Sequence, residues 1–143
     1  MDIKGKKIVL VGGAGLIGSH TVDHLIKEDV KEILIYDNMV RGSEENLHDA
    51  MKDPRVKIYD VGGDIMQTDI LQSAFDGSDG VFHFAALWLL QCYDYPCSAF
   101  DVNIRGPFNA MEACVAKGEK RLVSSSSASV YGVHYTTAVS ISL

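Results

Sequence analysis

Short runs of consecutive apolar residues alternate along this chain with longer segments in which apolar and polar positions are mixed. Between the runs Ile8–Val11 and Ile33–Ile35, apolar residues recur at the spacing of one face of a helix. Apolar residues at successive strand positions are typical of a sheet covered on both faces. Strands separated by helix-length segments pair in parallel through right-handed crossovers. We therefore predict an α/β fold with a doubly wound parallel sheet. Its strands are predicted at 7–11, 32–36, 56–60, 80–84 and 120–125, and its helices at 16–28, about 43–51, about 68–75 and about 96–117.

The turn between the first strand and the first helix is rich in glycine, with Gly12, Gly15 and Gly18 in regular order. In a dinucleotide-binding turn such glycines allow a tight bend, a close approach of backbone to a diphosphate, and close packing of the helix. The helix N-terminus then offers free N–H groups and the positive end of its dipole to the phosphates. No Gly-Lys-Ser/Thr follows, which excludes a Walker-type phosphate loop. The motif predicts a dinucleotide site.

The second predicted strand ends in Asp37, at the distance from the glycines where an acid binds the adenosine ribose. A carboxylate there accepts hydrogen bonds from the ribose hydroxyls and repels a 2′-phosphate, so we predict NAD rather than NADP. Arg41 follows closely and could pair with a 2′-phosphate, which keeps NADP as the alternative. The competing interpretation of the whole motif is an ordinary strand-helix turn with a solvated Asp37.

Other chemically suggestive residues also follow predicted strands. In a parallel sheet, ligands bind beyond the carboxyl ends of the strands, where the strand order reverses. We therefore expect one site that collects residues from several strand ends. These residues are Gly12, Asp37, Asp64, His83–Ala86 and Ser124–Ser127.

Six segments carry motifs of one protein group. They are Gly12–His20 (Gly-Gly-Ala-Gly-Leu-Ile-Gly-Ser-His), Tyr36–Asn38, Gly63–Ile65, His83–Ala86, Val102–Gly106 (Val-Asn-Ile-Arg-Gly) and Ser125–Gly132 (Ser-Ser-Ser-Ala-Ser-Val-Tyr-Gly). In combination they resemble the extended short-chain dehydrogenases/reductases, the group that contains UDP-glucose 4-epimerase and dTDP-glucose 4,6-dehydratase. The group has Phe where this chain has Leu16. The resemblance covers about residues 5–132.

The resemblance implies a Rossmann-type NAD-binding domain over residues 1–132. It implies that Ser127 hydrogen-bonds the reacting hydroxyl or carbonyl, and it makes Tyr131 a candidate for proton exchange. The cofactor contacts that it implies are Gly12, Gly15, Leu16, Ile17, Gly18, Asp37, Asn38, Asp64, Ile65, Phe84, Ala85, Ala86, Asn103 and Ser125.

Several of these residues have a second interpretation. Asp64 could cap the helix near Thr68 or satisfy a turn, and Asn103 could be an ordinary amide inside a helix. The serine run could be a loop. We interpret His83 as a core histidine whose neighbours lie near the cofactor through their backbone.

The sequence departs from the group after Gly132. It lacks the Tyr-x-x-x-Lys pair, since Tyr135 is followed by Val139, which supplies no positive charge. In this group a C-terminal lobe binds the substrate, and we expect this lobe to be missing from the chain. The tail 133–143 alternates apolar and polar residues from Val139 to Leu143, which predicts an extra strand. We expect a homodimer, because a sheet face left uncovered needs a partner.

Composition agrees with one globular domain of 143 residues, with 47% hydrophobic and 22% charged residues. A net charge of −6 argues against binding to nucleic acid or to an anionic membrane. Apolar runs are too short for a membrane span or a signal peptide. Three cysteines without a Cys-x-x-Cys motif predict reduced thiols and a cytoplasmic protein. His20 and His24 share a helix face without a third ligand, so we predict no metal site.

Three functions remain open at this point. The first is an NAD-dependent oxidoreductase, related to nucleotide-sugar epimerases, that acts on a small carbonyl or a nucleotide sugar. The second is a dinucleotide-binding module without catalysis. The third is an inactive fragment of a longer epimerase.

Overall fold

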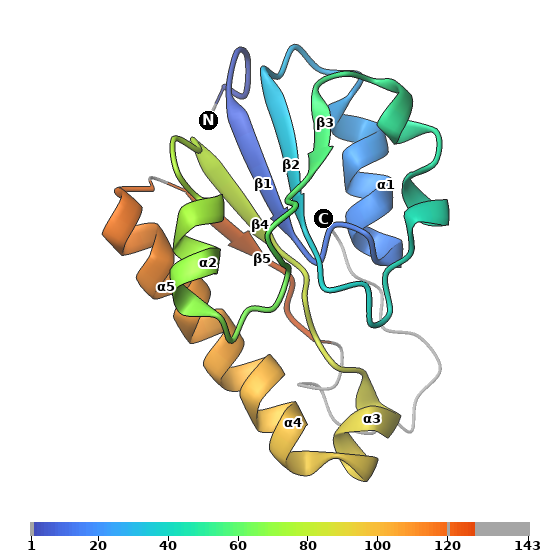
Figure 1. Cartoon of the computed structure of the whole chain (residues 1–143), viewed down its shortest axis with the longest axis vertical. Helices are drawn as coiled ribbons and strands as arrows, with labels where there is room; N and C mark the ends of the chain where they lie inside the picture. Colours follow the sequence, from blue (N-terminus) through green and yellow to red (C-terminus); the bar gives the residue numbers. More distant parts are fainter. Residues whose placement is uncertain (1, 120, 128–143) are drawn as a thin grey trace, which may run out of the picture.

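A computed structural model describes residues 2–119 and 121–127. Within these residues one sheet contains five strands in the order β3-β2-β1-β4-β5, and every neighbouring pair is parallel (Figure 1). The strand order reverses between β1 and β4, because the chain builds outward from β1 on both sides. This is the predicted doubly wound Rossmann-type sheet, and the fold prediction is confirmed. The strands are β1 (Lys7–Val11), β2 (Glu32–Tyr36), β3 (Val56–Ile58), β4 (Gly80–His83) and β5 (Leu122–Ser124).

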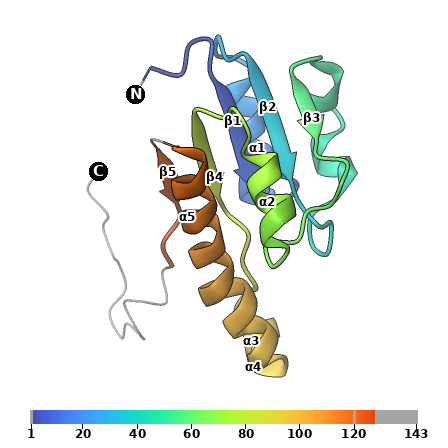
Figure 2. The same cartoon turned by 60° about the vertical axis from the view of Figure 1, so that its left-hand side comes forward.

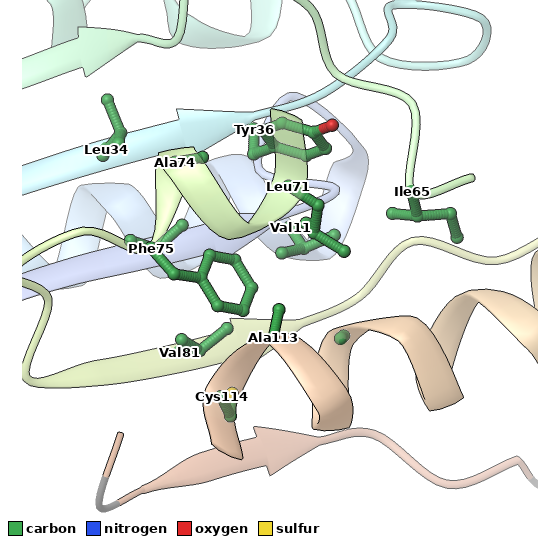
Figure 3. Close-up of a cluster of buried hydrophobic side chains, with 12 residues drawn as sticks. Val11, Leu34, Tyr36, Ile65, Leu71, Ala74, Phe75, Val81, Ala113 and Cys114 are labelled. Atoms are coloured by element: carbon green, nitrogen blue, oxygen red, sulfur yellow. The ribbon is translucent and has the colours of Figure 1, made fainter. Parts of the chain in front are cut away.

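Helices cover both faces of the sheet (Figures 1 and 2). Because side chains alternate along a strand, Ile8 and Leu10 pack toward α1 (Leu16–Leu25), whereas Val9 and Val11 pack toward the opposite face. The opposite face is covered by α2 (Thr68–Ala74) and α5 (Gly106–Lys117), as Figure 3 shows around Phe75. The consecutive apolar positions of the strands therefore serve two separate core clusters.

Arg55 fixes the end of α1 that lies away from the glycine turn. Its guanidinium donates hydrogen bonds to the carbonyl oxygens of Ile26 at 2.6 Å and of Glu28 at 2.9 Å. It also forms an ion pair with Asp53 at 2.7 Å. Arg55 thereby satisfies carbonyl groups at the C-terminal end of α1 and places a positive charge beside the negative pole of the helix.

The predicted helix at 43–51 is wrong in type. The segment forms two 3₁₀ turns, η1 (Glu44–Leu47) and η2 (Ala50–Lys52). Its two buried residues, Leu47 and Ala50, are three positions apart, which matches the three residues per turn of a 3₁₀ helix. The prediction for 16–28 is also too long, since α1 ends at Leu25. β3 and β4 likewise end at Ile58 and His83, before the predicted ends.

The long helix predicted at 96–117 is composite. It consists of α4 (Pro96–Phe100), a π-helical turn η3 (Asp101–Arg105) and α5, which ends at Gly118 with φ +69°. A further helix, α3 (Leu89–Asp94), was not predicted. None of the α3 residues is buried, so the segment has no amphipathic pattern to recognise. The tail 133–143, on which the predicted extra strand depends, lies outside the described residues.

Candidate functional site

A crevice of about 240 Å³ opens at the carboxyl ends of β1, β2 and β4, where the strand order reverses. A second hollow of about 330 Å³, here called the turn pocket, shares five lining residues with the crevice: Gly12, Gly15, Arg41, Phe84 and Ala86. Leu16, Ile17 and Gly18 line the turn pocket. Figure 1 shows the loops after β1, β2 and β4 together at the lower end of the sheet. Predicted cofactor residues that line the crevice are Gly12, Gly15, Asp37, Asn38, Asp64, Ile65, Phe84, Ala85 and Ala86.

Glycines allow three backbone segments to meet at the base of these hollows. Gly12 has φ +79°, and a Cβ atom there would lie 2.5 Å from the backbone nitrogen of Ala85. A Cβ at Gly18 would overlap the carbonyl oxygen of Gly12. Larger residues at either position would push α1 or the loop after β4 away from β1. These two glycines are therefore required by the fold.

Gly15 differs from its two neighbours in the motif. A Cβ at Gly15 would meet only the carbonyl oxygen of Gly12, at 3.5 Å, which is ordinary contact distance. Gly15 lines both the crevice and the turn pocket, so a side chain there would project into the open space. It is also the N-cap of α1, and no side chain caps the helix. The first turn of α1 therefore leaves its N–H groups for a ligand. This arrangement matches the chemistry of a bound diphosphate.

The carboxylate of Asp37 is held beside the glycine turn. One oxygen accepts a hydrogen bond from the backbone N–H of Ala14 at 2.9 Å, and the other accepts one from Met39 at 2.9 Å. Each oxygen keeps a free lone pair for a hydroxyl group. A Cβ at Gly63 would overlap the carbonyl of Asp37, so the loop after β3 packs tightly against the end of β2. The position of the acid is therefore fixed from two sides.

Tyr36 lines the crevice and is not among the predicted cofactor contacts. Its hydroxyl group donates a hydrogen bond to the backbone carbonyl of Asp64 at 2.8 Å, and its ring lines the crevice. Burial raises the pKa of Tyr36 to about 12, with a further contribution from Asp64, so the hydroxyl stays protonated as a donor. One sequence feature indicates its place: Tyr36 is the last residue of a buried strand and lies two residues after Leu34, on the same face of the sheet.

The loop that follows β3 is fixed by short contacts of its own. The Asp64 carboxylate accepts a hydrogen bond from the N–H of Met66 at 2.9 Å, which closes a turn before α2. Asn109 of α5 donates to the carbonyl of Ile65 at 3.0 Å. Asp64 therefore does not cap α2 through its side chain, since the N-cap position is Gln67. Its contact with an adenine ring stays a prediction.

Asn103 lies in the π-helical turn η3 and holds the loop that follows β4. Its side-chain oxygen accepts a hydrogen bond from the N–H of Leu87 at 2.7 Å, and its amide nitrogen donates to the carbonyl of Leu87 at 3.0 Å. Both polar atoms of the amide thus serve the backbone of one residue that lines the crevice. A direct contact of Asn103 with a cofactor stays a prediction.

The predicted residues of the serine run are only partly described. Ser125 and Ser127 are exposed and follow β5, the strand beside β4. Tyr131 lies outside the described residues. The roles of these three residues therefore stay predictions.

His83 is buried at the end of β4, with 4% of its surface exposed. Neither ring nitrogen has a hydrogen-bond partner among the described residues. Burial lowers the pKa of His83 from its ordinary value, because the charged imidazolium would lose its hydration. This environment agrees with the interpretation of His83 as a core histidine.

We expect His83 to make the protein less stable in mild acid. The neutral ring is favoured in the folded state, so between the lowered pKa and about 6.5 the unfolded chain binds more protons. The free energy of unfolding should fall as the pH decreases below about 6.5, by up to ~1.4 kcal/mol per pH unit.

Urea unfolding at about pH 7.5 and about pH 5.5 measures this loss. His83→Leu should reduce the pH dependence, whereas His20→Gln, at an exposed position, should retain it. Comparison of His83→Leu with the wild-type protein isolates His83, because these two proteins share all other titrating groups. An equal dependence in His83→Leu would contradict the prediction.

Arg41, which the sequence offered as a partner of a 2′-phosphate, lines both the crevice and the turn pocket and contacts Trp88, a residue that the sequence did not connect with the site. The Arg41 guanidinium carbon lies 5.1 Å from the centroid of the Trp88 ring, a cation–π contact between two loops. Such a pairing of distant loops leaves no periodic signal in a sequence. The crevice is also lined by Val40, Gly42, Gly63, Leu87, Ser98 and Val102, which are not among the predicted cofactor contacts.

No group of three or more His, Cys, Asp or Glu side chains in the described part of the chain could hold a metal ion. His20 faces Asp23 at 3.6 Å. No helix among residues 2–119 and 121–127 is both long and apolar enough to cross a bilayer.

Comparison with known proteins agrees with the geometry. Residues 9–140 match the 3-beta hydroxysteroid dehydrogenase/isomerase family. The chain is 35% identical over 130 residues to a UDP-glucose 4-epimerase of Streptococcus mutans. The aligned region covers 88% of this chain and 37% of that protein.

Solved structures show the same relationship. A UDP-N-acetylglucosamine 4-epimerase of Methanobrevibacter ruminantium, in complex with UDP-N-acetylmuramic acid, superposes with a TM-score of 0.82 at 34% identity, over 96% of this chain and 43% of that one. A UDP-glucose 4-epimerase of Brucella ovis in complex with NAD gives a TM-score of 0.79 at 26% identity, over 94% and 39%. The chain thus spans about two fifths of the length of these relatives. It belongs to the 3-beta hydroxysteroid dehydrogenase/isomerase family, within the extended short-chain dehydrogenases/reductases, and corresponds to the N-terminal portion of the related epimerases and dehydratases.

Proposed function

We propose that the chain binds NAD(H) across the crevice and the turn pocket. The observation that carries this proposal is the Asp37 carboxylate, which is held against the glycine turn by the N–H of Ala14 at 2.9 Å. A ribose acceptor and a diphosphate cradle must lie next to each other for one dinucleotide to use both. Here one hydrogen bond joins them.

The adenosine half of the ligand belongs in the crevice. The free lone pairs of Asp37 accept hydrogen bonds from the two ribose hydroxyls. The adenine ring lies between the loops after β2 and β3, where the Tyr36 hydroxyl and Asn109 hold Asp64 and Ile65 in place. The pocket wall is preformed, because Gly63 allows the two loops to touch.

The diphosphate belongs in the turn pocket. Gly15 leaves the backbone bare, and the uncapped first turn of α1 offers N–H groups and the positive pole of the helix. This half of the site recognises two phosphates through the main chain.

NAD is favoured over NADP by the charge at the ribose. No ion pair joins Arg41 to Asp37 within the described residues, so the Asp37 charge is not neutralised by that side chain. A 2′-phosphate placed there would meet a carboxylate at short range. The Brucella ovis relative is a complex with NAD.

Titration calorimetry with NADH and NADPH tests the proposal. We expect NADH to bind more tightly than NADPH. Asp37→Ala should lower the affinity for NADH at least ~tenfold, because hydrogen bonds to a charged acceptor contribute about 1.5–3 kcal/mol each. Asp60→Ala, at an exposed carboxylate after β3, is the matched control and should leave the affinity unchanged. Thermal unfolding without ligand shows whether each variant is folded. Absence of NADH binding in the folded wild-type protein would refute the proposal.

The proposal extends from cofactor binding to a reaction. Bound NAD in its oxidised form would accept a hydride from the carbon of a substrate hydroxyl, and NADH would donate a hydride to the carbon of a substrate carbonyl; Ser127 would orient either group. With a small carbonyl compound and NADH the absorbance of NADH would then fall, and with a nucleotide sugar and oxidised NAD it would rise. If NADH binds and its absorbance stays constant with every substrate tested, the chain is a binding module without catalysis.

A further inference from the structure

Arg41 and Trp88 make a cation–π contact between two loops. Arg41 belongs to the loop after β2, and Trp88 is the N-cap of α3 in the loop after β4. β2 and β4 lie on either side of β1, so a contact between their loops crosses over the carboxyl end of β1. The contact is a guanidinium carbon at 5.1 Å from the ring centroid. Because Arg41 lines both the crevice and the turn pocket, the contact lies beside the place where the two hollows adjoin.

Arg41 carries the positive charge of this region. Among the described residues that line the crevice or the turn pocket, it is the one Lys or Arg, and it lines both. Neither an ion pair nor a hydrogen bond engages its guanidinium within the described residues, so its N–H donors are available. The neighbouring Gly42 packs close to Asp37, yet Arg41 turns toward Trp88 rather than toward that carboxylate.

A diphosphate would compete with the indole for this side chain. Guanidinium–phosphate hydrogen bonds are charge-assisted and bidentate, whereas an exposed cation–π contact is weak. Trp88 retains 46% of its surface exposed, so the contact with the indole is only partly desolvated. The arginine therefore has a better partner as soon as two phosphates occupy the turn pocket.

We propose that Arg41 and Trp88 form a clasp that opens on binding, when the Arg41 guanidinium leaves the indole and binds the diphosphate of the ligand. The clasp rests on the proposed function, because it requires a dinucleotide at this site. It adds a side-chain contact to a diphosphate site otherwise built from main-chain groups. It also assigns Arg41 to the diphosphate and not to a 2′-phosphate.

The single tryptophan of the chain reports on the clasp directly. Trp88 fluorescence should change when adenosine diphosphate binds, because the guanidinium leaves the ring. Adenosine, which lacks the phosphates, should bind without that change. Arg41→Gln should lower the affinity for adenosine diphosphate about tenfold and leave the affinity for adenosine unchanged, since only the phosphates contact the arginine. Calorimetry measures the affinities separately from the fluorescence.

Arg105→Gln is the matched control. Arg105 makes the same type of contact, 5.8 Å from the centroid of the Phe100 ring, and does not line either hollow. Its replacement should leave both affinities and the Trp88 response unchanged. An equal loss in Arg41→Gln and Arg105→Gln would mean a general charge effect and would overturn the clasp.

Trp88→Leu tests the competition itself. Without the indole, Arg41 has no contact to break, so adenosine diphosphate should bind about two- to fivefold more tightly. Weaker binding in Trp88→Leu would place the ring in the ligand site and overturn the clasp. Full affinity in Arg41→Gln would overturn it while NADH binding still supports the proposed function. Failure of the wild-type protein to bind both NADH and adenosine diphosphate would overturn both proposals.

Discussion

Gly15→Val is expected to lower the affinity for NADH by about 100-fold while the protein stays folded. The backbone of Gly15 has φ −73° and ψ 173°, an extended conformation that valine adopts readily. The space beyond its Cβ position is the opening in which we place the diphosphate. Two methyl groups there would hold the phosphates away from the N–H groups of α1, which loses several hydrogen bonds to charged oxygens.

The same variant should lose no more than ~1 kcal/mol of stability, since valine is a poorer N-cap than glycine. Gly18→Ala gives the opposite result. Its methyl group would overlap the backbone of Gly12, so the free energy of unfolding itself should fall. Calorimetry with NADH and urea unfolding of both variants separate the two effects. If Gly15→Val binds NADH with undiminished affinity, the placement of the diphosphate in the turn pocket is contradicted.

Phe75→Ala should have the largest effect on stability. Phe75 is fully buried at the C-terminal end of α2, in the cluster between the sheet, α2 and α5 (Figure 3). Loss of a buried phenyl ring from such a core costs about 3–5 kcal/mol. The free energy of unfolding of a domain of this kind is about 5–15 kcal/mol in total, so the variant should be near the limit of folding.

Tyr93→Ala is the control for this variant. Tyr93 is 87% exposed on α3, and its removal should change the free energy of unfolding by no more than ~0.5 kcal/mol. Urea unfolding followed by circular dichroism measures both variants. A loss below ~1 kcal/mol in Phe75→Ala would mean that the α2 face contributes little to the core.

Local patterns were sufficient to predict the sheet and the glycine turn. Strands such as Ile33–Ile35 lie between two helical layers, so apolar residues occupy both faces and leave a continuous run in the sequence. The glycine spacing is equally local, because Gly12 and Gly18 touch each other across a single turn. Periodicity and spacing therefore carry enough information for these elements.

Contacts between distant segments could not be predicted in this way. α3 buries none of its residues, and the pairing of Asn103 with Leu87 depends on how η3 lies against the loop after β4. The hydrogen bond from Tyr36 to Asp64 likewise joins residues 28 positions apart. These contacts decide how the walls of the site are held, and they arise only when the sheet has assembled.

The two ends of α1 differ in how their partial charges are compensated by other parts of the chain. Arg55 balances the negative pole with hydrogen bonds of 2.6 and 2.9 Å to backbone carbonyl oxygens, whereas no side chain caps the positive pole at Gly15. The helix is thus an electrical dipole with one end compensated internally and the other end left to an outside anion. Its field near Gly15 persists when nothing is bound, so attraction of an anion costs no rearrangement of the helix itself.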